Sequence, residues 1–116
     1  MKKEDRKKLV TEYLNTKPDM GIIYLYCKNT EEYYIDISTN IRANLNRNIA
    51  QLGFNAHPNK QLQSLWESYG QSSFEYGVLA QLEYDEKQPD KNDYTEELEE
   101  LFNKKMTELK GAKKIR

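Results

Sequence analysis

The chain has 116 residues, 37% of them hydrophobic and 11% aromatic, which fits one small globular domain with a core of its own but not two. Its formal net charge of −1 at pH 7 gives no global positive field that would draw it to nucleic acid or to an anionic membrane. Cys27 is the single cysteine and no apolar run approaches the roughly 20 residues of a membrane span, so we expect a cytoplasmic protein without disulfides or membrane association.

A short helix and then a β-hairpin are predicted at the start of the chain. The helix is expected from about Glu4 to Leu14 and ends before Pro18, so residues 1–20 form an N-terminal helical extension. The stretch from Gly21 to Cys27 is rich in Ile and Tyr, and a polar turn leads to a second β-branched and aromatic run. This hairpin opens the main domain, residues 21–110.

Two helices with apolar stripes are predicted next. The first begins at capping residues 38–40 and ends at Gly53, with apolar positions at Ile41, Leu45, Ile49 and Leu52. The second runs from Asn59 to Tyr69 and ends at Gly70, with apolar positions at Leu62, Leu65, Trp66 and Tyr69.

A third strand and a last helix complete the predicted domain. Phe74 to Leu82 alternates apolar and polar residues with the period of a strand. The acidic stretch from Glu83 to Asp93 is predicted to be a flexible loop, and Asp93 with Glu96 predicts a capping box for the last helix. That helix carries the apolar residues Leu98, Leu101, Phe102, Met106 and Leu109. Residues 111–116 remain as a basic C-terminal tail.

Sequence motifs on the hairpin and beyond it are similar to those of a known family. The hairpin segments "GIIY" and "YYID", with "HPNKQLQSLWESYGQSSFEYGVLAQLE" from His57 to Glu83, resemble the GIY-YIG nuclease domain over about Gly21 to Leu109. The resemblance implies an α+β fold, a small antiparallel three-stranded sheet flanked by helices. It also implies hydrolysis of a DNA phosphodiester with one divalent metal ion, Mg²⁺ or Mn²⁺.

The hairpin departs from the family pattern. By spacing from Gly21, Ile23 occupies the slot of a tyrosine that helps to activate or orient the attacking water in the family. Tyr24 is adjacent, but successive strand side chains point to opposite faces, so a compensating role requires a bulge or a register shift. Tyr34 keeps a phenol that could contact a water or a phosphate, with sheet packing as the alternative. Asp36 replaces a glycine, and its charge would repel a phosphate.

The first predicted helix lacks two polar groups of the family. Spacing puts Asn44 in the slot of an arginine and Asn48 in that of a histidine. Asn48 falls within the apolar stripe, so these asparagines are either functional relics or partners for the sheet or for the loop near His57, as buried polar groups require. Arg47 points roughly 100° away from Asn48 and either touches a backbone phosphate or lies solvated on the surface.

The metal ligand that the resemblance implies is a glutamate on the last helix. Glu99, three residues before Phe102, fits that spacing, and Glu97 is the second candidate. A solvated acidic face is the alternative for both residues. His57 is the sole histidine, so it makes neither a multi-histidine metal site nor a catalytic triad, and a catalytic and a structural role both remain open.

The changed positions predict a degenerate GIY-YIG domain, impaired or inactive as a nuclease and retained for nucleic-acid or protein binding. Loss of a general base costs roughly 10²- to 10⁴-fold in rate, and loss of a cation that stabilises developing phosphate charge costs a comparable factor. The alternative is an active metal-dependent DNA endonuclease with an altered site made of Tyr24 or Tyr34, Arg47 and Glu99.

DNA binding is expected to be weak and salt-sensitive, because the domain core carries no basic excess. Basic residues gather instead at the two ends of the chain, at Lys2, Lys3, Arg6, Lys7, Lys8, Lys104, Lys105, Lys110, Lys113, Lys114 and Arg116. They form a phosphate-binding rim if the two ends converge, and solubilising termini otherwise. The many tyrosines and the acidic loop make a protein partner the alternative.

Overall fold

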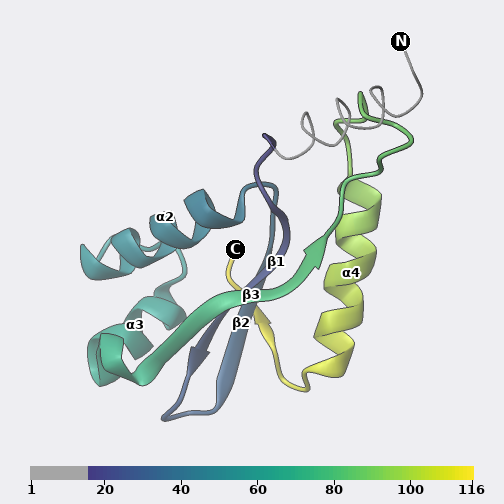
Figure 1. Ribbon diagram of the computed structural model, residues 1–116. Coiled ribbons are helices and arrows are strands. Elements are labelled where there is room, and N and C mark those ends of the chain that lie inside the picture. The colour runs from purple at the N-terminus through teal and green to yellow at the C-terminus, as the bar shows by residue number, and fades with distance from the viewer. Residues whose placement is uncertain (1–15) are drawn as a thin grey trace.

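Residues 16–116 are described by the computed structural model, and they form one sheet with helices on both faces (Figure 1). The strands are β1 (Met20–Cys27), β2 (Glu32–Ser38), β3 (Phe74–Leu82) and β4 (Lys113–Lys114), in the order β3-β1-β2-β4. Antiparallel pairing joins β1 to β2 and to β3, whereas β4 runs parallel to β2. The predicted helix from Glu4 to Leu14 lies outside the described residues.

The predicted α+β class is confirmed, but the sheet is mixed and has four strands, which corrects the prediction of a three-stranded antiparallel sheet. The added strand, β4, comes from the segment 111–116 that was predicted to be a basic tail. Ile115 follows it and is 1% exposed, and its N–H donates to the carbonyl of Ile35 at 2.9 Å. One apolar side chain therefore anchors an otherwise basic segment in the core.

The helices of the described residues are α2 (Ile41–Gly53), α3 (Lys60–Tyr69) and α4 (Thr95–Glu108), with a short 3₁₀ turn, η1 (Gln71–Ser73). Asn40 and Asn59 cap α2 and α3, because the side-chain oxygen of each accepts a hydrogen bond from a backbone N–H in the first turn. None of these helices is long and apolar enough to cross a membrane. The predicted cytoplasmic location stays a prediction.

The predicted capping box at the last helix is wrong. The side chain of Asp93 accepts a hydrogen bond from the backbone N–H of Thr95 at 3.0 Å, and α4 begins after Tyr94 without a side-chain cap. In the acidic loop before it, the hydroxyl of Tyr94 accepts a hydrogen bond from the N–H of Asp85 at 3.0 Å. These contacts tie the loop to the start of the helix.

The sheet separates two apolar cores (Figure 1). On one face, α2 and α3 cover Ile23, Leu25 and neighbouring side chains of the hairpin. On the other face, α4 places Phe102 against Ile22 and Ile35. Because β1 alternates between the faces, both of its sides are buried, and this explains why its sequence is apolar almost throughout.

Gly21 marks the closest approach of two strands. A Cβ atom at this position would lie 2.1 Å from the carbonyl oxygen of Ala80 on β3, a distance that no side chain tolerates. The register between β1 and β3 shifts just beyond it, between Ile22 and Ile23, where Leu79 is the extra residue of β3. The first glycine of the hairpin is thus required by strand packing.

Candidate functional site

A cleft of about 390 Å³ opens between the end of β2 and the first turns of α2. Its lining is Asp36, Ile37, Ser38, Thr39, Asn40, Ala43, Asn44 and Arg47. The cap at Asn40 starts α2 directly after β2, and residues three or four apart share a helix face, so Asn44 and Arg47 meet Asp36 here. The structure therefore brings together three positions that the sequence singled out.

Asp36 is half-buried at the floor of this cleft, and its Oδ1 accepts a hydrogen bond from the N–H of Ile37 at 2.9 Å. Burial raises the pKa of the Asp36 carboxyl, and this outweighs the lowering effects of the Ile37 hydrogen bond and of the nearby cations. Those cations are Arg116, Arg47 and Lys114. A carboxylate that is costly to ionise thus lies among positive charges.

A chain of hydrogen bonds leads inward from the cleft. The side-chain nitrogen of Asn48 donates to Oδ1 of Asn44 at 2.7 Å and to its backbone carbonyl at 2.9 Å. On the outer side, Asn44 Oδ1 lies 3.5 Å from a guanidinium nitrogen of Arg47. Asn48 is 0% exposed, so its amide is available only to these neighbours and to His57.

His57 completes the chain. Nε2 of its ring lies 2.7 Å from Oδ1 of Asn48, and its Nδ1 accepts a hydrogen bond from the N–H of Asn59 at 3.0 Å. These partners assign the proton to Nε2, since Nδ1 is already an acceptor. Burial, with a smaller contribution from the charges of Arg116 and Arg47, lowers the pKa of His57 to about 4. The ring is therefore neutral at pH 7, and both nitrogens are engaged.

The two hairpin positions, Ile23 and Tyr24, lie on opposite faces of the sheet. Ile23 is 0% exposed in the core under α2 and α3, whereas Tyr24 packs in the core under α4. The irregularity between β1 and β3 leaves the alternation of β1 intact, because the pairing of β1 with β2 is continuous. Tyr24 packs beside Gly77 of β3, and it is not among the residues that line the cleft.

Tyr34 points into the core that α2 and α3 cover, where it is 1% exposed. Burial, followed by the negative charge of Glu32, raises its pKa to about 12. Lys113 lies over its ring, 5.8 Å from the centroid, and forms an ion pair with Glu32 at 2.7 Å. The phenol is thus covered by its own chain, which fits the sheet-packing interpretation.

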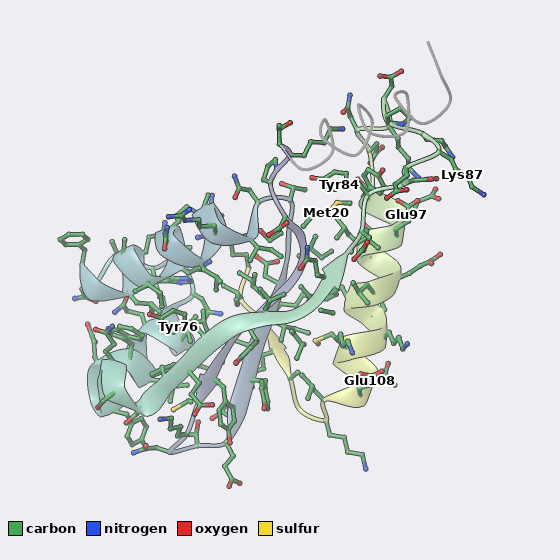
Figure 2. The ribbon with its side chains drawn as sticks, viewed as in Figure 1. Met20, Tyr76, Tyr84, Lys87, Glu97 and Glu108 are labelled. Carbon is green, nitrogen blue, oxygen red and sulfur yellow. The ribbon has the colours of Figure 1, made fainter. Side chains whose placement is uncertain are left out.

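The glutamates proposed as metal ligands do not meet the cleft. Glu99 is exposed on α4, the helix on the other face of the sheet from α2. Glu97 lies at the first turn of α4, near the loop that carries Tyr84 and Lys87 (Figure 2), and its Oε1 is bound by Lys91 at 3.1 Å. Within residues 16–116, no three His, Cys, Asp or Glu side chains gather as metal ligands.

Three residues that form hydrogen bonds around the cleft and His57 were not indicated by the family motifs. The side-chain nitrogen of Asn59 donates to the carbonyls of Lys114 and Ile115 at 3.2 and 3.0 Å, which fixes the C-terminal segment. Gln63 accepts from the N–H of His57 at 3.1 Å. Arg116 donates to the side-chain oxygen of Gln51 on α2 at 2.6 Å. The sequence predicted a helix that starts at Asn59 and a basic C-terminal tail, but not the contact between them.

The arrangement, with two helices on one face of the sheet and one on the other, is consistent with the fold of the GIY-YIG nuclease domain. The catalytic domain of the homing endonuclease I-TevI matches this chain with a TM-score of 0.66 and 18% sequence identity, over 84% of this chain and 98% of that one. A glutamate-to-alanine mutant of the I-TevI catalytic domain, there described as an intron endonuclease, matches with a TM-score of 0.61 and 19% identity, over 78% and 84%. At these identities the likeness concerns the fold alone. No family model and no curated protein matches the sequence.

Proposed function

We propose that this chain is a divergent GIY-YIG domain that binds DNA and does not cleave it at an appreciable rate. The observation that carries the proposal is the pair formed by Asn48 and His57, 2.7 Å apart, in which the side-chain groups of both residues are used by their neighbours. A residue whose hydrogen-bonding groups are all engaged in the fold has none left for a water or a leaving group.

Acid–base chemistry at neutral pH supports the same conclusion. A general acid or base works best with a pKa near the working pH and within reach of the reacting group. His57 has a pKa of about 4 and Tyr34 a pKa of about 12, so neither is poised to exchange a proton near pH 7. Ile23 has no proton to exchange. Burial raises the pKa of the Asp36 carboxyl, while the nearby cations act to lower it.

Binding to DNA is supported by the charges around the cleft. Arg47 lines it, and Arg116 is close enough to act on the Asp36 carboxyl. A guanidinium group binds phosphate oxygens in a bidentate manner, and such contacts are independent of base sequence. With so few cations we expect weak binding that falls steeply as salt is added.

The alternative, an active nuclease with Tyr24 or Tyr34, Arg47 and Glu99, requires these groups to converge on one phosphate. Against it stand the burial of Tyr34 and the location of Tyr24 on the opposite face of the sheet from Tyr34. Glu99 is on α4 and Arg47 on α2, and these helices also cover opposite faces of the sheet. A large rearrangement would be needed to assemble them.

Nicking of supercoiled plasmid tests the proposal. Purified protein is incubated with Mg²⁺ or Mn²⁺ at low salt, beside a Glu99→Ala variant purified in the same way to reveal contaminating nuclease. We expect the plasmid to remain supercoiled in both samples, or to be cut equally by a contaminant. Cleavage by the parent protein that is lost in Glu99→Ala would overturn the proposal.

A further inference from the structure

The C-terminal segment, residues 112–116, is fixed to the domain from three directions. The N–H of Ile115 donates to the carbonyl of Ile35 on β2 at 2.9 Å, and the Ile115 side chain is buried in the core. Asn59, at the start of α3, donates to the carbonyls of Lys114 and Ile115. The segment ends on the side of the sheet that α2 and α3 cover (Figure 1). The direction of its last side chains is therefore defined by the fold.

This docking carries a second arginine to the surface of α2. Arg116 donates to Oε1 of Gln51 at 2.6 Å. Gln51 lies four residues after Arg47, and residues four apart are neighbours on one helix face, roughly 6 Å apart at their Cβ atoms. Arg116 is thus bound to the α2 face that carries Arg47, and the charges of both arginines act on the Asp36 carboxyl in the cleft.

Neither arginine forms an ion pair within 4.0 Å with a carboxylate of residues 16–116. Among the described residues, the ion pairs within 4.0 Å use other cations: Lys28, Lys91, Lys105 and Lys113. Arg47 and Arg116 are both exposed, and their contacts at the surface are to the side-chain oxygens of Asn44 and Gln51, which are neutral. Neutral acceptors orient a guanidinium but leave its charge uncompensated.

We propose that Arg47 and Arg116 form a two-arginine site for a phosphate group, and that Asn59 is the positioning residue that holds Arg116 in it. The ligand class is a phosphate monoester or diester, and the function proposed above supplies its source, the DNA backbone. The C-terminal segment thus contributes in cis a cation next to the helix position where the family's arginine is replaced by Asn44.

The first test uses inorganic phosphate and does not depend on DNA. In NMR titrations with phosphate, the side-chain Nε–Hε signals of Arg47 and Arg116 are expected to shift together and to saturate. Arg116→Gln should abolish the saturable shift of Arg47, whereas Lys113→Gln, which removes the neighbouring charge already paired with Glu32, should leave it unchanged. If the two arginine signals do not respond, or respond independently, the proposal is overturned.

The second test measures binding of a fluorescent DNA duplex by anisotropy across a salt series. Arg116→Gln is expected to weaken binding roughly threefold to tenfold and to reduce the slope of log affinity against log salt by about 1, as for one lost phosphate contact. Arg116→Lys should recover part of the slope. If DNA binds equally well to the parent and to Arg116→Gln, the site is wrong although the proposed function stands. If phosphate binds but DNA does not, the site stands and the function fails.

Asn59→Asp tests the positioning role. The aspartate keeps the oxygen that caps α3 at Leu62 but loses the donor to the C-terminal carbonyls. It should lower the salt slope as Arg116→Gln does, and the double variant should bind no more weakly than either single variant. Asn103→Asp, the same charge change on α4, is the control and should bind as the parent does. Additive losses in the double variant would contradict a positioning role.

Discussion

His57 and Asn48 are joined by a contact of 2.7 Å between Nε2 of the ring and Oδ1 of the amide, deep under α2. Asn48 lies at the position where the GIY-YIG resemblance implies a histidine, and its side-chain nitrogen donates to Oδ1 of Asn44. The polar chain from Asn44 through Asn48 to His57 is closed within the protein. The consequences concern pH, stability and anion binding.

The titration of His57 is the first consequence. With a pKa lowered to about 4, its ring stays neutral down to mildly acidic pH. Because it is the sole histidine of the chain, one set of ring C–H signals in an NMR pH titration reports on it alone. We expect a midpoint close to 4, and a midpoint near the ordinary 6.5 would show that the ring is not buried in solution.

The lowered pKa of His57 should make the stability of the protein depend on pH. Between pH 6.5 and 4 the unfolded chain binds a proton at His57 that the folded chain does not, so the free energy of unfolding decreases as the pH falls through this window. The upper bound is roughly 3 kcal/mol, reduced by solvent screening. Urea titrations of the parent and of His57→Gln at several pH values measure it. Equal pH slopes for the two proteins over this range would contradict the expectation.

Removal of the Asn48 amide should destabilise the fold. Asn48→Ala leaves the Nε2–H of His57 without its acceptor in a buried site, which costs about 1–3 kcal/mol. The matched control is Asn46→Ala, an exposed position on the same helix, which should change stability by less than about 0.5 kcal/mol. Chemical denaturation compares them, and equal stability of both variants would show that the polar chain contributes little.

Gly21 and Gly53 offer a paired test of strand packing. In Gly21→Ala the new Cβ would collide with the backbone of Ala80, so we expect a loss of several kcal/mol, on the order of overpacking in a core, or failure to fold. Gly53→Ala, where nothing lies within 4 Å, should stabilise the end of α2 by up to about 1 kcal/mol. Thermal unfolding separates the two, and a Gly21→Ala protein as stable as the parent would refute the close approach.

Asp36→Asn should strengthen anion binding. The asparagine can still accept the hydrogen bond from Ile37, while the negative charge next to Arg47 and Arg116 is removed. We expect affinity for a DNA duplex to rise several-fold, with Glu31→Gln, the same charge change in the hairpin turn, as a control of smaller effect. For the parent, affinity should also rise as the pH falls toward the raised pKa of Asp36. Weaker binding by Asp36→Asn would contradict this arrangement of charges.

Sequence patterns were sufficient for the elements that local chemistry determines. The Ile- and Tyr-rich run of β1, the capping residues 38–40 and the glycine after Tyr69 predicted the hairpin, α2 and the end of α3 close to their observed bounds. The motifs also led to the correct fold. These features depend on neighbours within a few residues, or on a family pattern that survives at low identity.

Long-range pairing could not be predicted in the same way. The strand β4 has two residues, and only its parallel contact with β2, about 80 positions earlier in the chain, makes it a strand. The hydrogen bond from Asn59 to Lys114 also joins segments that are far apart in the sequence. The burial of Tyr34 and the separation of Glu99 from the cleft likewise depend on how distant segments pack. Spacing along one helix places a residue on a face, but it does not say what covers that face.

The central claim, binding without cleavage, is tested most directly on one end-labelled DNA duplex. Its binding is followed by anisotropy at low salt with Mn²⁺ present, and the same sample is then run on a denaturing gel. We expect saturable binding that weakens with added salt, and a strand that remains full length. Shortened product made by the parent protein and not by Glu99→Ala, or no binding at any salt concentration, would contradict the account.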